Sequence, residues 1–164
     1  MNEIEAAMGV EQLKRVEGFL KIRARNFAAL EEGLASVDGL TLLKKAEPPF
    51  THSHYCFQTL LDPKIAPRRP EIIEAFKAVG IGTSVYYPAP VPRMHYYREK
   101  YGYDEHLYPN AARMSDHSIA LPVGPHVEPN DIDYIIEQTR MIMGKFLSEK
   151  QSRNLRSTKA QHKA

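Results

Sequence analysis

The chain has 164 residues, which is enough for one domain with a hydrophobic core. Its composition, 43% hydrophobic and 26% charged, excludes a disordered or fibrous chain, and no apolar run approaches the roughly 18 residues of a membrane-spanning helix. The single cysteine, Cys56, excludes an internal disulfide and fits a reducing compartment, so we expect a soluble cytoplasmic protein without a membrane partner.

The net charge of +2 is concentrated at the C-terminal end of the chain. We therefore expect two regions, a domain over residues 1–147 and a basic, disordered tail over residues 148–164. A basic tail can contact phosphates, but this one has no aromatic residue that would stack on a base, so we do not favour nucleic acid as a partner. Against one acidic residue, positions 149–164 carry five basic ones: Lys150, Arg153, Arg156, Lys159 and Lys163.

The first predicted element is a long amphipathic helix that begins at Asn2. The pattern from Asn2 to Glu5 is typical of helix N-termini, because the two side chains can satisfy free backbone N–H groups. Gly18 lies inside the helical pattern, and we expect a bend or break there between two helical pieces. The apolar stripe of this segment has helical spacing: Ile4, Met8, Val16, Phe19, Leu20, Phe27, Leu30 and Leu34.

Short elements follow, and their order predicts the fold class. Helices and strands in mixed order predict an α+β or α/β layered fold, with a small sheet packed against helices. Gly80 follows one predicted helix at the position typical of a C-terminal glycine. The expected strands cover residues 40–43, 54–61, 81–87 and 118–123, and the expected helices cover residues 70–79, 94–100 and 109–117, with a last helix that opens near residues 128–131.

Isolated histidines, a cysteine and an acidic residue provide only weak signals for catalysis or metal binding. His52 and His54 alternate, so on a strand their imidazoles share a face, but no third ligand is evident and we expect no metal site. Asp116 and His117 are either an acid–base pair or the ordinary end of a helix, and we favour the latter. We interpret Cys56 as a buried strand cysteine, because a nucleophilic cysteine needs a partner base nearby.

The stretch GIGTSVYYPAPVPRMHYYREKYGY, residues 80–103, has a composition typical of a binding site. Tyr86 and Tyr87 end a predicted strand and lead into a stiff loop with three prolines, and further tyrosines follow. Loops at strand ends commonly hold ligands, and tyrosine offers a flat apolar face with a hydroxyl group, which suits a sugar or a nucleotide. An aromatic cluster that closes over the loop explains the same residues equally well, so both interpretations stay open.

Four segments of the sequence occur in an order that is typical of one family. The opening MNEIEAAMGVEQLKRVEGFLKIRARNFAAL is similar to a family helix, and HYCFQTLL is similar to the strand that follows it. EIIEAFKAVGIGTSVYYPAPVP resembles a helix, glycine turn and strand that end in a His/Tyr-Tyr-Pro motif, and the stretch from YREKYGY to DIDYIIEQ resembles the closing section. Over about residues 1–147 the chain thus resembles the C-terminal part of the DegT/DnrJ/EryC1/StrS family of pyridoxal-phosphate-dependent sugar aminotransferases.

The resemblance implies a fold like that of aspartate aminotransferase, with this chain as its small C-terminal domain, and a homodimer with active sites at the subunit interface. Family members use pyridoxal phosphate to transfer an amino group, usually from glutamate, to a keto-sugar attached to a nucleotide. The family's cofactor-binding lysine lies in a Ser-x-x-x-Lys setting ahead of the opening helix, and this pattern does not occur in the sequence. The resemblance therefore implies no catalytic and no cofactor-binding residue here, and we expect no pyridoxal phosphate on this chain alone.

The resemblance does imply substrate-binding residues. Tyr86, Tyr87 and Pro88 match the His/Tyr-Tyr-Pro motif, which in the family lies near the sugar. Many relatives have a histidine slightly later in this loop, where the present chain has Pro92. His95, three residues further on, is the candidate replacement for that imidazole.

Two functions follow as alternatives. In the first, the chain is the small domain of a sugar aminotransferase of amino-sugar or surface-polysaccharide biosynthesis, inactive without an N-terminal cofactor domain that a partner chain supplies. In the second, it is a non-enzymatic module that binds a nucleotide sugar or another protein. Glu3 aligns with an acidic family position at the active-site edge, although a carboxylate also suits the first turn of a helix. We further expect the apolar face near Ile4 and Met8 to seek a partner.

Overall fold

The computed structural model describes residues 1–44, 47–104 and 106–161, with side chains described as far as Glu149. Its fold combines helices with a small antiparallel sheet, so the predicted α+β class is confirmed. The helices are α1 (Glu3–Leu34), α2 (Arg69–Ala78), α3 (His95–Tyr101), α4 (Pro109–His117) and α5 (Pro129–Gln161), the strands are β1 (Leu40–Leu42), β2 (Phe57–Leu61) and β3 (Ser118–Leu121), and two 3-10 turns are η1 (Ala66–Arg68) and η2 (Val91–Arg93).

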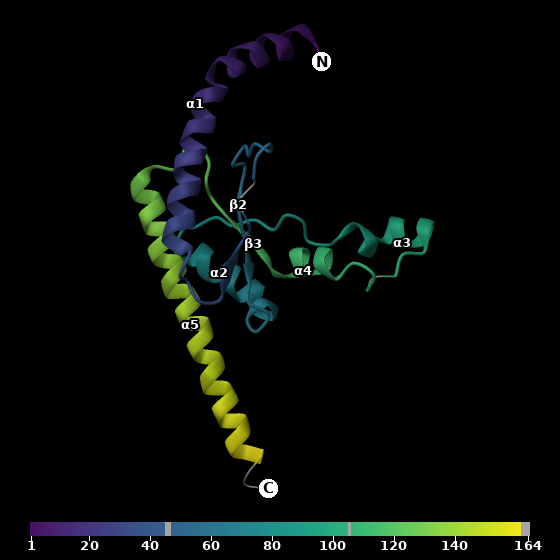
Figure 1. The fold of residues 1–164 in the computed structure, drawn as a ribbon, viewed down its shortest axis with the longest axis vertical. Helices are drawn as coiled ribbons and strands as arrows, with labels where there is room; N and C mark the ends of the chain where they lie inside the picture. Colours follow the sequence, from purple (N-terminus) through teal and green to yellow (C-terminus); the bar gives the residue numbers. More distant parts are fainter. Residues whose placement is uncertain (45–46, 105, 162–164) are drawn as a thin grey trace.

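The sheet has the strand order β1-β2-β3, and both strand pairs are antiparallel. In the central strand, Phe57 lies opposite Leu121 and Leu61 lies opposite Leu40. Figure 1 shows α1 and α5 packed side by side next to this sheet, and α2 packs against α5. The core draws apolar residues from all these elements: Leu30, Leu34, Phe57, Leu61, Ile72, Phe76, Ile119, Ile132, Met143 and Phe146.

Helix α1 begins as the sequence predicts and then continues past its expected break. The side chain of Asn2 accepts a hydrogen bond from the Glu5 N–H, and the side chain of Glu5 accepts one from the Asn2 N–H, both at 2.9 Å. The predicted break at Gly18 does not occur, because the helix runs unbroken to Leu34. One glycine costs a helix only about 1 kcal/mol relative to alanine, which is too little to end it. Figure 1 shows that α1 bends markedly in its N-terminal half, with its first turns standing clear of the sheet.

Two predicted strands differ from what the structure contains. The strand expected from residue 54 begins only at Phe57, because the backbone of His54 has a φ of 50°, outside the extended region. Residues 81–87 form no strand; within them Ser84 pairs with Ala120 through hydrogen bonds of 3.1 and 2.8 Å. The prolines that follow cannot donate to a sheet ladder, which limits this pairing to one bridge.

The remaining predicted elements are confirmed with small shifts at their ends. Gly80 has a φ of 77°, its N–H donates to the Lys77 carbonyl at 3.0 Å, and the Ile81 N–H donates to the Phe76 carbonyl at 2.9 Å. This double pattern is the Schellman motif, in which glycine adopts the left-handed conformation at low cost. The strands predicted over residues 40–43 and 118–123 and the helices predicted over residues 70–79, 94–100 and 109–117 correspond to β1, β3, α2, α3 and α4.

Helix α5 extends beyond the predicted end of the domain. The sequence predicted a disordered tail over residues 148–164, whereas the helical backbone continues through Gln161. Residues 148–161 contain neither glycine nor proline, which is compatible with a helix, and the disorder of the tail stays a prediction. Residues 162–164 and the side chains from Lys150 onward, including the predicted basic cluster, lie outside the described part of the chain.

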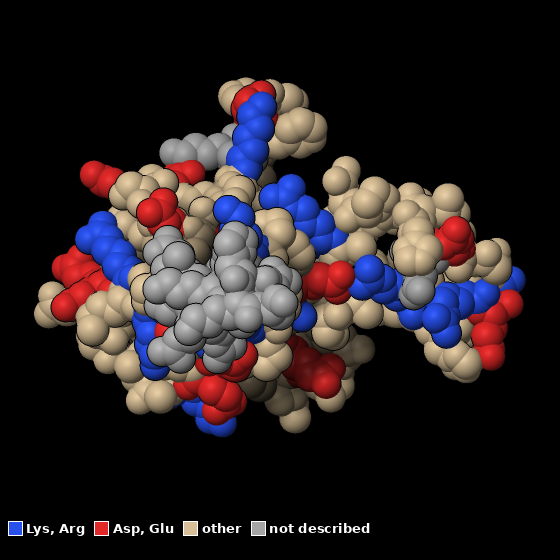
Figure 2. Space-filling model, turned by 90° about the horizontal axis from the view of Figure 1, so that it is seen from below, with Lys and Arg blue, Asp and Glu red and all other residues tan. Residues whose placement is uncertain are grey.

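The loop between residues 81–87 and α4 projects sideways from the body of the fold. We call residues 88–108, which include η2 and α3, the arm (Figure 1). Figure 2 shows the arm reaching out to one side, with acidic and basic side chains interspersed along it. None of the described helices combines the length and the apolar character needed to cross a membrane.

Candidate functional site

Three tyrosines meet where residues 81–87, the segment that Ser84 bridges to Ala120, pass the start of β2. We call Tyr55, Tyr86 and Tyr87 the tyrosine cluster. The ring centroids of Tyr55 and Tyr86 are 6.1 Å apart, and those of Tyr86 and Tyr87 are 6.2 Å apart. Gln58 Nε2 donates a hydrogen bond of 2.9 Å to the Tyr86 carbonyl, which holds the backbone at the centre of the cluster. Hydrogen bonding with the Tyr86 side chain raises the pKa of the Tyr55 phenol above its ordinary value.

The tyrosine cluster presents aromatic surface to solvent. Tyr87 is 71% exposed and Tyr55 is 63% exposed, whereas Tyr86 between them is half-buried. Pro88 follows directly and is exposed at the base of the arm. Three of the residues that the resemblance places near a sugar therefore form one continuous, accessible patch.

The structure separates His95 from this patch. His95 starts α3 within the arm, and its Nε2 lies 3.2 Å from the Oε1 atom of Glu99. Within the described ranges, no hydrogen bond, ion pair or ring contact joins His95 to Tyr86 or Tyr87. The four predicted substrate-binding residues thus divide into Tyr86, Tyr87 and Pro88, which lie together up to the base of the arm, and His95, which lies further along the arm.

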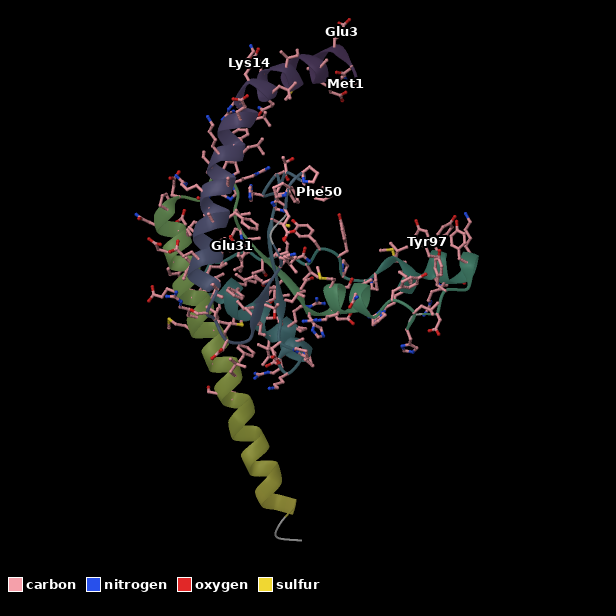
Figure 3. The ribbon with its side chains drawn as sticks, viewed as in Figure 1. Met1, Glu3, Lys14, Glu31, Phe50 and Tyr97 are labelled. Carbon is pink, nitrogen blue, oxygen red and sulfur yellow. The ribbon has the colours of Figure 1, made fainter. Side chains whose placement is uncertain are left out.

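The later tyrosines of the loop contact one another in the arm. Tyr97 and Tyr101 stack with an interplanar angle of 17°, and Lys100 Nζ lies 5.2 Å from the ring centroid of Tyr96. Figure 3 shows Tyr97 far out on the arm, away from the sheet. For these residues the structure supports the interpretation as an aromatic satellite cluster. Ring contacts connect five tyrosines in order: Tyr96, Tyr97, Tyr101, Tyr103 and Tyr108.

An ion pair joins the arm to α4. Arg93 in η2 donates from one Nη atom to both carboxylate oxygens of Asp116, each at 2.9 Å. The carboxylate of Asp116 is therefore engaged by a guanidinium group, and His117 is the last residue of α4. This arrangement supports the interpretation of Asp116 and His117 as a helix end.

A cavity of about 480 Å³ lies between α1 and the segment that connects β1 to β2. Glu31 on α1 and Phe50 on the connecting segment both line it, and Figure 3 shows the two elements facing each other. Gln58, which holds the Tyr86 backbone, also lines the cavity and so connects it to the tyrosine cluster. Sequence reasoning missed this cavity, because its walls combine α1 with two later segments between residues 42 and 58, which only the folded chain brings together.

The histidines and the cysteine of the cavity wall fit a structural role. The His54 N–H donates to His52 Nδ1 at 3.0 Å, and the ring centroids of the two histidines are 4.8 Å apart. Burial, followed by the neighbouring His52, lowers the pKa of His54, and burial raises the pKa of the Cys56 thiol. A thiol with a raised pKa is a poor nucleophile. Across residues 1–44, 47–104 and 106–149, no three potential ligand side chains gather as a metal site.

Pyridoxal phosphate, the cofactor that the resemblance implies, does not fit the residues described here. The cofactor needs a lysine that bonds to it covalently in a site sheltered from water. Every described lysine side chain is exposed, and Lys44, which lines the cavity, pairs with Glu47 at 2.7 Å. We therefore assign no step of amino transfer to a residue of this chain.

Asn26 is a buried polar residue that the sequence analysis did not identify. Its Nδ2 donates to the carbonyl of Val127 at 2.9 Å and to that of Gly124 at 3.3 Å, which joins α1 to the loop ahead of α5. The neighbouring Arg25 donates to its Oδ1 at 3.0 Å. The available signal was an asparagine four residues before Leu30, inside the apolar stripe of α1.

Glu3 lies in the exposed first turn of α1. Figure 3 shows it at the far end of this helix, remote from the sheet. Its position favours the interpretation as a carboxylate that interacts with the helix dipole.

Sequence comparison identifies relatives that are longer than this chain. The family model described as the DegT/DnrJ/EryC1/StrS aminotransferase family matches residues 1–140. The spore coat polysaccharide biosynthesis protein SpsC of Bacillus subtilis is 31% identical over 150 residues, which cover 87% of this chain and 37% of SpsC. The lipopolysaccharide biosynthesis protein RfbH of Salmonella typhimurium is 26% identical over 145 residues, which cover 88% of this chain and 33% of RfbH. The chain thus spans about a third of the length of these relatives.

Structural comparison gives the same result. DesV from S. venezuelae superimposes with a TM-score of 0.78 at 26% identity, over 87% of this chain and 37% of DesV. Spr1654 from Streptococcus pneumoniae, solved in its PMP-form, superimposes with a TM-score of 0.83 at 26% identity, over 92% of this chain and 37% of Spr1654. These matches confirm the predicted aspartate-aminotransferase-like fold. With a family match over residues 1–140, the chain belongs to the DegT/DnrJ/EryC1/StrS aminotransferase family.

Proposed function

We propose that this chain provides the sugar-binding side of an aminotransferase that acts on nucleotide-linked keto-sugars in amino-sugar or surface-polysaccharide biosynthesis. The tyrosine cluster is the observation that carries the proposal, because it presents exposed aromatic surface at the segment that resembles the family's His/Tyr-Tyr-Pro motif. SpsC and RfbH are named for the biosynthesis of polysaccharides, which supports a sugar substrate for this chain as well.

The residues of the motif have distinct roles in this proposal. Tyr87 is exposed, and its ring packs on an apolar face of the sugar. Tyr86 is half-buried, and Gln58 holds its backbone, so Tyr86 positions Tyr87. Pro88 restricts the backbone beyond the motif. His95, which lies beside Glu99 in the arm, would contact the sugar only if the arm moves toward the tyrosine cluster.

The chemistry of amino transfer belongs to residues that the described chain does not supply. No lysine within the described ranges is sheltered from water, and the match covers only 37% of SpsC. We propose that a cofactor-binding N-terminal domain completes the enzyme and that the complete enzyme is a homodimer. When bound there, pyridoxal phosphate supplies the electron sink that lets an amino group leave its donor.

The proposal is tested by complementation. Amino transfer from glutamate to a nucleotide-linked keto-sugar is measured with this chain alone and after addition of the part of SpsC that lies outside the match, with pyridoxal phosphate present in both. We expect product only in the mixture. Tyr87→Ala should lower kcat/KM in the mixture by roughly tenfold, the effect of one lost aromatic contact. Tyr101→Ala, in the satellite cluster of the arm, is the matched control and should leave kcat/KM unchanged.

Two results would contradict the proposal. Product from the chain alone would show that it carries its own cofactor lysine. Saturable binding of a nucleotide sugar by the chain alone, lost in Tyr86→Ala or Tyr87→Ala and accompanied by no product in the mixture, would identify a non-enzymatic module instead.

A further inference from the structure

Arg23 on α1 is half-buried and has a guanidinium nitrogen that lacks an acceptor. Its Nε atom is buried and has no hydrogen-bond partner among the described residues. Its guanidinium carbon lies 5.9 Å from the ring centroid of Tyr55, within the range of a cation–π contact. Arginine stays charged at every physiological pH and has five N–H donors, so leaving them without acceptors in a sheltered place is unfavourable.

The other half-buried arginines of the described chain differ from Arg23. These are Arg68, Arg69 and Arg93, and each donates to oxygen atoms of the protein itself. The acceptors come from another part of the chain or from the next turn of a helix. Arg68 leaves its Nη1 without a partner but donates from its other nitrogens, whereas Arg23 donates to no acceptor among the described residues, so its acceptor lies outside them. The satisfied pairs are Arg68 with Glu71 and Glu149, Arg69 with the carbonyls of Ser115 and Ser118, and Arg93 with Asp116.

The surroundings of Arg23 suit an anion. The positions three and four residues away on α1, which are its neighbours on the helix surface, carry no acidic residue. Across from α1, the exposed Tyr55 offers a phenolic O–H, and Tyr86 and Tyr87 continue the aromatic surface beyond it. The four neighbouring positions on the helix are Phe19, Leu20, Asn26 and Phe27.

We propose that the Arg23 guanidinium binds an oxyanion of the substrate beside Tyr55, at the edge of the tyrosine cluster. The ligand group is a phosphate or a carboxylate, since the planar fork of arginine matches both with two parallel hydrogen bonds. The identity of the molecule rests on the proposed function, in which a nucleotide sugar carries a diphosphate and the amino donor carries carboxylates. The site itself rests only on the geometry of Arg23 and Tyr55.

The site is tested with the whole chain and two simple probes. Inorganic pyrophosphate and glutarate are titrated separately into ¹⁵N-labelled protein, and the Nε–Hε signals of arginine are followed by NMR. We expect one probe to shift the Arg23 signal saturably, with a Kd on the order of 1 mM. Preference for pyrophosphate indicates the nucleotide diphosphate, and preference for glutarate indicates the amino donor.

Variants separate a specific site from general attraction to positive charge. Arg23→Gln should weaken binding of the preferred probe by at least roughly tenfold, because it removes charge-assisted hydrogen bonds. Arg15→Gln is the matched control, since Arg15 is exposed on the same helix and lies 5.0 Å from the Phe19 ring. It should leave the affinity unchanged. Arg23→Lys keeps the charge and loses the fork, so it should weaken binding several-fold and serves if Arg23→Gln does not fold.

Three outcomes would overturn the proposal. These are the absence of a saturable shift with either probe, unchanged binding in Arg23→Gln, and an equal loss of binding in Arg15→Gln. A shift of the Arg23 signal caused by the complementary part of SpsC, but by neither probe, would show that a protein carboxylate is the acceptor and would also overturn it. The titration needs no cofactor and no amino transfer, so its failure and the failure of the proposed function are distinguishable.

Discussion

His54 packs its ring against Phe27 and His52 in the wall of the cavity between α1 and β2. The pKa of His54 is lowered first by burial and then by His52, while the carboxylate of Glu31 opposes this shift. A positive charge on this imidazole is therefore less favourable in the folded chain than in the unfolded chain. At the scale of one residue, burial beside neighbouring rings lowers the pKa of the His54 imidazole and so favours its neutral form.

This charge state predicts a pH dependence of stability. Because the folded pKa of His54 lies below its usual value of 6.5, the unfolded chain binds more protons between the two values, and the free energy of unfolding decreases as the pH falls through 6.5. Urea denaturation at a series of pH values measures this slope. His54→Gln should flatten the slope below pH 6.5, whereas His126→Gln, at an exposed position, should keep it. An unchanged slope in His54→Gln would contradict the assignment.

At the scale of elements, two glycines set how helices end and approach one another. Gly33 near the end of α1 faces α5, and a Cβ atom at this position would lie only 2.8 Å from Ile136 Cγ1. The two helices can therefore come close only because position 33 has no side chain. Gly80 ends α2 in a left-handed conformation with open space around it, so its role depends on backbone conformation rather than on packing.

Gly80→Ala tests this distinction, and Gly82→Ala is its matched control. Both positions have room for a Cβ atom, but a positive φ is recorded at Gly80 and not at Gly82. We expect Gly80→Ala to lower the free energy of unfolding by about 1 kcal/mol, because a Cβ atom disfavours the left-handed conformation. Gly82→Ala should have a smaller effect, as measured by urea denaturation. Equal losses in both variants would rule out the conformational explanation.

At the scale of the whole molecule, the first half of α1 extends beyond the core. Its buried residues are Asn26, Leu30 and Leu34, all in the second half of the helix. Figure 1 shows the N-terminal turns free of contact with the sheet. The apolar residues predicted to seek a partner are exposed here, with Ile4 at 74% and Met8 at 65%. An apolar stripe of this kind is typical of a surface that packs against another part of a protein.

We therefore expect the isolated chain to associate through this stripe. Light scattering coupled to size-exclusion chromatography should show oligomers whose fraction increases with protein concentration. The double variant Ile4→Glu and Met8→Glu should reduce this fraction, because it places charges on the apolar surface. Gln12→Glu adds a charge on the same helix without removing apolar surface, and it should change the fraction little. A strictly monomeric chain at every concentration would contradict the expectation.

Much of the candidate site was predictable, but its grouping was not. Tyr86, Tyr87 and Pro88 are adjacent in sequence, so their proximity needed no tertiary information. Their contact with Tyr55 depends on the bridge between Ser84 and Ala120, which no local pattern indicates. That these residues bind a sugar stays a prediction.

The sequence alone determined features that depend on neighbours within a few residues: the capping box of Asn2 and Glu5, the glycine end of α2, and α4 from Pro109 to His117. These need only local hydrogen bonds and backbone preferences. Tertiary packing determined where β2 begins and the loss of the strand expected over residues 81–87. It also placed Arg23 beside Tyr55. The physical reason is that strand pairing and side-chain burial join segments far apart in the chain, so their free energies are absent from any local pattern.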